Sequence, residues 1–151
     1  MPPDPPVAPV APVADVTVII PAYRAEQTIG RALASVAGQT LKPCAAVVVD
    51  DGSPDGTRDA ALAWQNRMEG VRLTVIGQPN AGPGAARNRA IAEAETEFLA
   101  FLDADDEWLP EKLARSMAHM ADGDYVLVAH DSFAVDGAGK RRILFLFTFC
   151  C

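Results

Sequence analysis

The chain has 151 residues, of which 50% are hydrophobic, and carries a formal net charge of -7 at pH 7. A chain of this size can bury one hydrophobic core, which predicts one main domain. The negative charge argues against non-specific binding to nucleic acid, because phosphate backbones attract basic proteins. Three cysteines and two histidines show no spacing typical of a disulfide framework or a zinc site, which favours the reducing cytoplasm.

The first residues are mostly Pro, Ala and Val with a single acid. This composition predicts a disordered, extended leader over residues 1–14, because prolines prevent a helix and the segment has little to pack. It lacks the basic start and unbroken apolar core of a signal peptide. We therefore expect the main domain to cover residues 15–136.

Strands and helices are expected to alternate from residue 16 onward. Short runs of apolar and β-branched residues predict strands over residues 16–20, 45–49, 71–76 and 97–102. Helical spacing of apolar residues, capping residues and an Ala-rich stretch predict helices over residues 26–40, 55–68 and 85–94. The order β-α-β-α-β-α-β predicts an α/β fold with a doubly wound parallel sheet.

The rest of the chain has a different pattern. Pro110 is expected to open a helix, and residues 125–130 and 132–135 read as two strands before a hairpin turn at 136–139. Residues 137–151 form a tail with an apolar end about half as long as a transmembrane helix requires. We expect no membrane-spanning segment, and we interpret the tail as a sign of truncation or of a shifted reading frame.

An acidic cluster follows the fourth predicted strand. Asp103, Asp105, Asp106 and Glu107 lie close together in sequence, and such carboxylates raise each other's pKa unless a cation sits among them. Mg²⁺ and Mn²⁺ take oxygen ligands and commonly share them with phosphates. The cluster thus predicts a metal-diphosphate site. The alternative is a helix start, in which Asp105 or Asp106 is the N-cap and Pro110 lies in the first turn.

A second acidic pair, Asp50 and Asp51, follows the second predicted strand. Open α/β sheets bind ligands beyond the carboxyl ends of their strands, so both acidic groups could face one crevice. Residues 21–23 follow the first strand at the same edge. The alternative is turn chemistry around Gly52, although two adjacent aspartates exceed what a turn needs.

The loop of residues 80–88 carries a third signal. Its glycines allow close approach of a ligand to the backbone, the following helix offers free N–H groups to anions, and Arg87 adds a positive fork. These features predict an anion-binding loop. The alternative is an ordinary loop with an arginine on a solvated helix face.

Five segments resemble the family 2 nucleotide-sugar glycosyltransferases, which are inverting enzymes of the GT-A fold. They are residues 18–23, 35–40, 48–57, 82–88 and 100–113. Their order and spacing also match, over roughly residues 16–136, which is more specific than any single motif. The resemblance implies a GT-A (Rossmann-like), doubly wound, mostly parallel sheet with helices on both faces, incomplete at the C-terminus.

The resemblance also implies roles for residues at the first two strand ends. The base and ribose pocket would be lined by Pro21, Ala22 and Tyr23, with the tyrosine ring stacking near the base. Asp51 would accept hydrogen bonds from the base, and Asp50 would support the turn. Family members often have Asn after the tyrosine, where this chain has Arg24.

At the diphosphate end, Asp103 and Ala104 would lie beside the ribose and diphosphate, with Arg87 as a further contact. The implied metal ligands are Asp103, Asp105 and Asp106, and the implied ion is Mn²⁺ or Mg²⁺. A divalent cation would neutralise charge on the leaving phosphate.

The implied function is metal-assisted transfer of a sugar, with inversion, from a nucleotide-sugar donor to a hydroxyl of a glycan, lipid or other acceptor. The catalytic residue is unknown: the family's general base lies downstream of the metal motif, and we expect it to be absent from this chain. The implied location is the cytoplasm or the inner face of a membrane.

Two alternatives stay open. The first is a catalytically inactive remnant that binds nucleotide-sugar without turnover. The second is a receiver-like signalling domain that binds Mg²⁺ with acids at strand ends. A receiver-like domain would have its acidic pair after the first strand and a lysine after a later one, whereas this first strand ends in Pro21, Ala22 and Tyr23.

Overall fold

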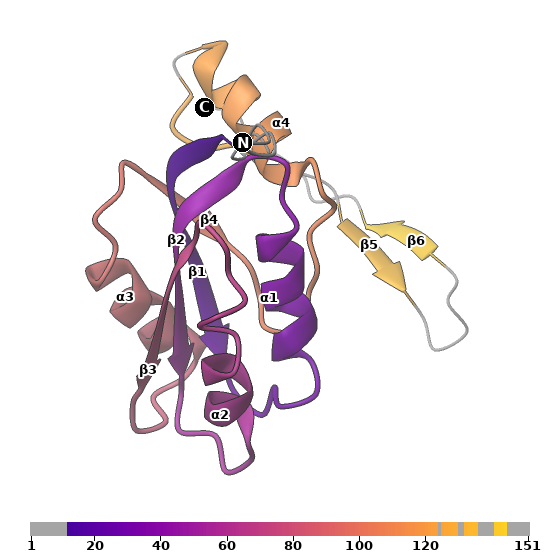
Figure 1. Ribbon diagram of the computed structural model, residues 1–151. Helices are drawn as coiled ribbons and strands as arrows, with labels where there is room; N and C mark the ends of the chain where they lie inside the picture. The colour runs from indigo at the N-terminus through magenta and orange to yellow at the C-terminus, as the bar shows by residue number, and fades with distance from the viewer. Residues whose placement is uncertain (1–11, 124, 130–131, 136–140, 145–151) are drawn as a thin grey trace, which may run out of the picture. The chain divides into compact units, whose positions relative to one another are not determined.

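The computed structural model describes residues 12–123, 125–129, 132–135 and 141–144. It divides into two compact units, one ending at Ala114 and the other beginning at Arg115. The first unit contains a four-stranded parallel sheet in the order β3-β2-β1-β4 (Figure 1). Its strands are β1 (Val13–Ala22), β2 (Lys42–Asp50), β3 (Arg72–Gly77) and β4 (Phe98–Phe101). The predicted parallel α/β sheet is confirmed.

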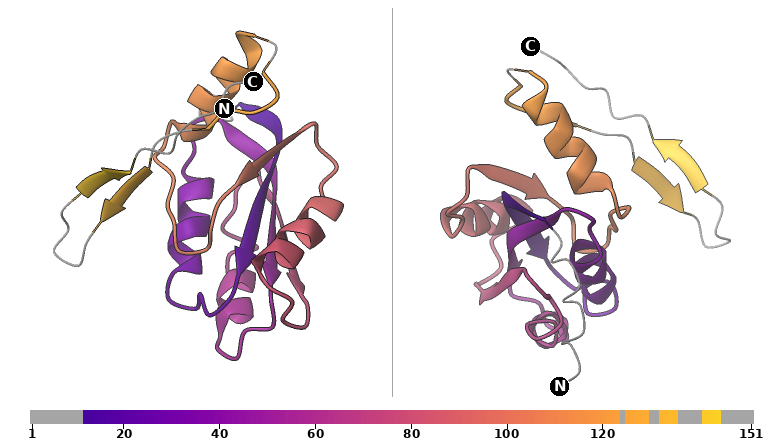
Figure 2. Two further views of the ribbon diagram at one scale, coloured as in Figure 1. Left: turned by 180° about the vertical axis from the view of Figure 1, so that it is seen from behind. Right: turned by 45° about the horizontal axis from the view of Figure 1, so that its top comes forward.

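Helices cover both faces of this sheet. Helices α1 (Ile29–Ala37) and α2 (Thr57–Leu62) lie on one face, and α3 (Pro83–Ala92) lies on the other, as Figures 1 and 2 show from opposite sides. Side chains of successive strand residues point to opposite faces. Ile20 accordingly packs in the core with α1 and α2, whereas Ile19 packs against α3. This is the doubly wound arrangement that the sequence predicted.

The register of the sheet aligns the strand ends. Ala22 pairs with Asp50, and Asp50 pairs with Gly77, so β1, β2 and β3 finish at one level. Strand β4 ends opposite Ile19, and the next backbone N–H, that of Leu102, still donates to Ile19 O at 3.1 Å. The residues after all four strands therefore emerge at a common edge.

Several boundaries differ from the predicted ones. Strand β1 begins at Val13, so the last two residues of the predicted leader, 1–14, belong to the sheet, while residues 1–11 lie outside the described residues. Helix α2 is shorter than predicted because the chain tightens after it. Trp64 N donates to Ala61 O and Gln65 N to Leu62 O, bonds that span three residues rather than the four of an α-helix.

The second unit contains an antiparallel pair, β5 (Ser132–Val135) and β6 (Arg141–Leu144). Strand β5 confirms one prediction. The predicted strand over 125–130 is wrong for residues 125–129, which pair with no strand among the described residues, and a strand needs a partner for its backbone groups. Residue 130, the predicted turn at 136–139 and residues 145–151 lie outside the described residues.

Strand β6 lies beyond the predicted domain limit at residue 136. It falls within the predicted tail, 137–151, yet it pairs with β5 from the predicted main domain. The limit at residue 136 would separate these two strands, whereas the compact units divide between Ala114 and Arg115. Helix α4 (Lys112–Ala121) begins in the first unit and continues into the second. In the described part of the chain, no helix combines the length and apolar character needed to cross a bilayer.

Candidate functional site

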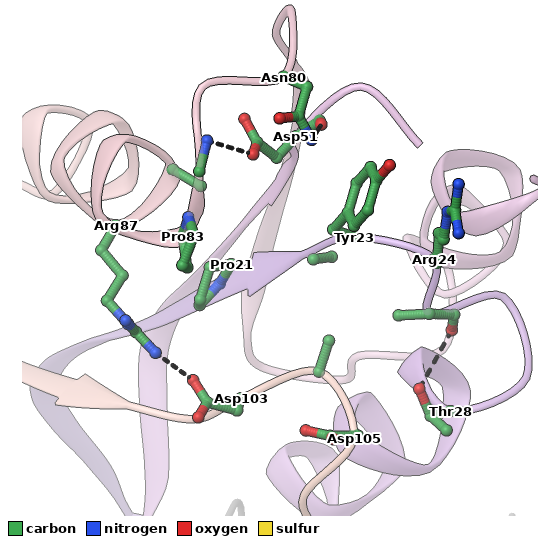
Figure 3. Close-up of a pocket in the computed structure, with 15 residues that line it drawn as sticks. Pro21, Tyr23, Arg24, Thr28, Asp51, Asn80, Pro83, Arg87, Asp103 and Asp105 are labelled. Atoms are coloured by element: carbon green, nitrogen blue, oxygen red, sulfur yellow. Dashed lines mark hydrogen bonds and ion pairs between the residues drawn. The ribbon is translucent and has the colours of Figure 1, made fainter. Parts of the chain in front are cut away.

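A pocket of about 780 Å³ opens where the strands of the first unit end (Figure 3). Its volume lies in the range of small-molecule sites, about 300–1,000 Å³. The predicted site residues that line it are Pro21, Ala22, Tyr23, Asp51, Arg87, Asp103, Ala104 and Asp105. Asp50 and Asp106 were predicted as site residues but are not part of the lining. The fold thus brings together both acidic groups and the arginine of the predicted anion-binding loop.

Asp51 is the most enclosed acid of the pocket, with 2% of its surface exposed. Its Oδ1 accepts hydrogen bonds from Gln78 Nε2 at 2.7 Å and from Ala81 N at 2.9 Å. Its Oδ2 accepts one from Gly82 N at 2.8 Å. Each carboxylate oxygen can accept about two hydrogen bonds, so Oδ2 has room for one more donor.

The same contacts keep Asp51 ionised. Burial by itself would raise the pKa of this carboxyl, but the hydrogen bonds from Ala81, Gln78 and Gly82 outweigh burial and leave the pKa below its ordinary value of 3.8. The pocket therefore holds a buried negative charge whose position is fixed by the loop of residues 78–82.

Asp50 has a structural role next to the pocket. It is 6% exposed, and its Oδ1 accepts a hydrogen bond from Ser53 N at 3.2 Å. Its backbone oxygen accepts another from Gln78 N at 3.0 Å. These bonds close the turn after β2 and tie it to the end of β3, so Asp50 stabilises the segment that carries Asp51.

Gly52 is required by the geometry of that turn. Its φ is +69°, a left-handed conformation, and a Cβ at this position would lie 2.8 Å from Asn80 N. Asn80 in turn donates from Nδ2 to Asp51 O at 3.0 Å. A side chain at residue 52 would therefore strain the backbone and push the 78–82 loop away from Asp51.

We expect Gly52→Ala to lower the free energy of unfolding by at least about 1–2 kcal/mol, the cost of placing a residue with a side chain in the left-handed region. Urea unfolding measures the change. Gly84→Ala is the matched control, because a Cβ there meets nothing within 4 Å and alanine favours the helix. Equal stability of Gly52→Ala and the unsubstituted chain would contradict this account of the turn.

An ion pair spans the other end of the pocket. Arg87, in the first half of α3, donates from Nη2 to Asp103 Oδ1 at 2.6 Å (Figure 3). The two side chains are 37% and 51% exposed, so the pair contributes little to folding stability. Its effect is to hold a guanidinium and a carboxylate side by side at the pocket surface.

The acidic segment after β4 forms a turn. Asp106 N donates to Asp103 O at 3.0 Å, which leaves Ala104 and Asp105 facing the pocket. Burial raises the pKa of Asp106, and the nearby charges of Asp105 and Asp103 raise it further. The segment is therefore a region of concentrated negative charge.

The acidic segment does not begin a helix. Helix α4 begins at Lys112, beyond Pro110, so neither Asp105 nor Asp106 is its N-cap and the helix-start alternative is wrong. Within the described residues, no three His, Cys, Asp or Glu side chains converge as a set able to hold a metal ion. The described residues therefore do not by themselves supply a complete ligand set for a cation at this segment.

The acidic segment and the residues just after it are held by Ser35 of α1 and by Gln39, which follows the end of α1. The sequence did not identify either residue individually. Ser35 Oγ accepts a hydrogen bond from Trp108 N at 3.0 Å. The buried Gln39 donates from Nε2 to Leu109 O at 2.8 Å and accepts from Leu113 N at 2.9 Å. In the sequence, the one indication of their importance is that both lie in residues 35–40, a segment that resembles the family.

Sequence reasoning also missed part of the lining. The additional lining residues are Arg24, Ala25, Thr28, Asn80, Gly82, Pro83 and Ala86. Four of them belong to the loop and helix start that the glycines had already marked as an anion-binding segment. Ala25 and Thr28 carry no chemical motif, and only the path of the chain after β1 brings them to the pocket.

Known proteins are similar to this chain in sequence. The sequence model described as Glycosyl transferase family 2 matches residues 17–148. The succinoglycan biosynthesis protein ExoW of Rhizobium meliloti is 46% identical over 108 residues, which are 70% of this chain and 34% of that protein. The chain spans 34%, 38% and 50% of the length of three curated relatives, a third to a half in each case.

Two solved structures have the same fold. Residues 1–349 of TarS from S. aureus, in complex with UDP, superpose with a TM-score of 0.64 at 34% identity, covering 71% of this chain and 32% of that one. The mannosyltransferase PcManGT from Pyrobaculum calidifontis, in complex with GDP-Man and Mn²⁺, gives a TM-score of 0.65 at 31% identity, covering 72% and 32%. The chain has the GT-A fold and belongs to glycosyltransferase family 2.

Proposed function

We propose that this chain forms the donor-binding part of an inverting glycosyltransferase, which moves a sugar from a nucleotide-sugar to a hydroxyl of a glycan or other acceptor. The observation that carries the proposal is a single pocket with an ionised acceptor, Asp51, at one end and Arg87, Asp103 and Asp105 at the other. A nucleoside diphosphate has matching ends, a hydrogen-bonding base and a charged diphosphate.

The base end of the pocket offers a ring and an acceptor. Tyr23 is 46% exposed and lines the pocket, so part of its ring is accessible to a base. Oδ2 of Asp51 has room for one further donor. The ring N–H of uracil, thymine or guanine could donate to it, whereas the corresponding ring nitrogen of cytosine or adenine is an acceptor and would be repelled. UDP is bound by TarS and GDP-Man by PcManGT, both with a base of the first kind.

The diphosphate end has ligands of the right kind for a hard cation. Asp105 and Asp103 supply carboxylate oxygens at the pocket wall, and Asp106 adds negative charge from just outside the lining. Mg²⁺ is typically held by one or two carboxylates together with substrate phosphates, which suits a segment with no complete protein ligand set. Mn²⁺ is present in the PcManGT complex. A divalent cation there would offset charge on the leaving diphosphate.

Arg87 and Asp103 would act as a pair at this end. The guanidinium is held by Asp103, and the Arg87 side chain is still 37% exposed where it lines the pocket. It could therefore donate N–H groups to a phosphate or sugar oxygen without losing its carboxylate partner. This arrangement would fix the diphosphate before the sugar is transferred.

The general base is proposed to come from outside this pocket. The carboxylates that line it are Asp51, Asp103 and Asp105 among the described residues, and each already has a proposed role with the donor. An inverting transfer needs a further base within hydrogen-bond reach of the acceptor hydroxyl. The matched region spans only 34%, 38% and 50% of three curated relatives, and we propose that the base and the acceptor site belong to their additional length.

Calorimetric titration in the presence of Mn²⁺ tests the proposed function. We expect UDP, GDP or dTDP to bind with one-to-one stoichiometry and at least about tenfold more tightly than CDP and ADP, because only the first three donate a ring N–H to Asp51. Inorganic pyrophosphate is the control for binding through the diphosphate alone. If no nucleoside diphosphate bound more tightly than pyrophosphate, the pocket would not be a nucleotide site.

A further inference from the structure

Arg24 has an unusual backbone for its residue type. It directly follows Tyr23, and its φ of +51° lies in the left-handed region, where residues with long side chains are uncommon. Its N–H donates to Ser53 Oγ at 3.0 Å, which ties the end of β1 to the turn after β2. A strained residue persists only where its surroundings hold it, and such residues are concentrated at ligand sites.

The side chain of Arg24 contacts the proposed base platform. Its guanidinium carbon lies over the Tyr23 ring, 5.3 Å from the centroid. Arg31, Arg72, Arg87 and Arg89 each form an ion pair with a carboxylate. Arg24 is therefore placed against an aromatic ring rather than against an acid.

The contact between Arg24 and Tyr23 lies at the wall of the pocket. Both residues line the pocket, and Figure 3 shows Arg24 beside the Tyr23 ring, while Arg87 and Asp103 lie across the cavity. Both Arg24 and Tyr23 are exposed, and a cation over an exposed ring adds little to folding stability. The strain and the exposure together argue that stability does not account for arginine at this position.

We propose that Arg24 is a positioning residue for the donor: its guanidinium stacks on the Tyr23 ring and fixes the ring as a platform for a nucleobase. This rests on the proposed function. An exposed tyrosine ring can rotate among rotamers, and a base can stack only on those that face it. Contact with a planar cation restricts the ring, so less conformational freedom is lost when the base binds.

Arg24→Asn separates strain from function because it moves two measurements in opposite directions. Asparagine tolerates the left-handed region, so we expect the melting temperature to rise by roughly 1–3 °C as strain is relieved. Loss of the stacked cation is expected to weaken the binding of UDP or GDP about two- to fivefold. Arg24→Lys keeps a cation and should retain more of the affinity than Arg24→Asn does.

The test is calorimetric titration of four proteins in Mn²⁺: the unsubstituted chain, Arg24→Asn, Tyr23→Ala and the double variant. The probes are UDP, GDP and inorganic pyrophosphate. We expect Arg24→Asn to weaken nucleotide binding when Tyr23 is present, to have no further effect when Tyr23 is alanine, and to leave pyrophosphate binding unchanged.

Two other outcomes of these titrations would overturn the inference, and a third would overturn the proposed function. Equal nucleotide affinity of Arg24→Asn and the unsubstituted chain would overturn the inference. A loss that persists in the Tyr23→Ala background would also overturn it, because Arg24 would then contact the ligand directly rather than act through the ring. If the unsubstituted chain bound neither UDP nor GDP, the proposed function itself would fail, a result distinct from the other two.

Discussion

Asp51→Asn is expected to lower both the stability of the chain and its affinity for nucleotides. An asparagine has one side-chain oxygen, so its NH₂ group would face at least one of the donors Gln78 Nε2, Ala81 N and Gly82 N that the carboxylate now satisfies. A hydrogen bond to a charged group contributes about 1.5–3 kcal/mol. We expect the free energy of unfolding to fall by about that amount and nucleotide affinity to fall by about tenfold or more.

Asp50→Asn is the matched control. Its carboxylate accepts a single hydrogen bond, from Ser53 N, which an asparagine oxygen can also accept, and it does not line the pocket. Urea unfolding and calorimetry of the two variants measure the contrast. Comparable losses in both, or an unchanged base preference in Asp51→Asn, would show that Asp51 has no special role.

The effect of Asp51 on stability should depend on pH. The pKa of this carboxyl is below 3.8 in the folded chain, so the folded state favours the ionised form more than the unfolded state does. Its contribution is fully present above the unfolded pKa and is lost as the pH falls through the folded pKa. The difference in unfolding free energy between the unsubstituted chain and Asp51→Asn should therefore be largest near neutral pH and shrink in acid below about pH 4.

Asp105→Ala is expected to remove the effect of Mn²⁺ on nucleotide binding. Asp105 faces the pocket, and the described residues offer no complete protein ligand set that could replace it. We expect affinity for UDP or GDP in Mn²⁺ to fall about tenfold or more, toward the value measured in chelator. Calorimetry with and without the ion measures the difference.

Glu107→Ala provides the control for Asp105→Ala. Glu107 belongs to the same acidic segment but pairs with Arg31 at 3.5 Å, is 53% exposed and does not line the pocket. Its removal lowers the local negative charge by the same amount without removing a pocket carboxylate. If Glu107→Ala reduced the Mn²⁺ effect as much as Asp105→Ala, general electrostatics rather than coordination would explain both.

Much of the fold was predictable because its signals are local. The apolar, β-branched run at residues 45–49 can be buried on both faces only in a covered sheet, and Pro21 marks the end of the first strand. Strand ends in a parallel sheet meet at one edge, so Asp51 and Asp103 could be placed near one another without coordinates.

What could not be predicted depends on contacts between distant segments. The three donors to Asp51 come from residues 78–82, which follow the neighbouring strand β3, and no periodicity signals them. Gln39, which follows α1, bonds to Leu109 and Leu113, which lie 70 and 74 residues further along the chain. Residues 125–129 have strand-like composition but no partner strand in the described chain, and composition cannot show whether a partner exists.

The central claim is that the pocket between Asp51 and Asp105 binds a nucleoside diphosphate together with a divalent cation. Calorimetric titration of the unsubstituted chain with UDP and with GDP, each in Mn²⁺ and again in chelator, tests it most directly. We predict saturable one-to-one binding that is at least about tenfold tighter in Mn²⁺ for at least one of the two nucleotides. The claim would be contradicted if each nucleotide bound as tightly in chelator as in Mn²⁺. It would also be contradicted if neither nucleotide bound under either condition.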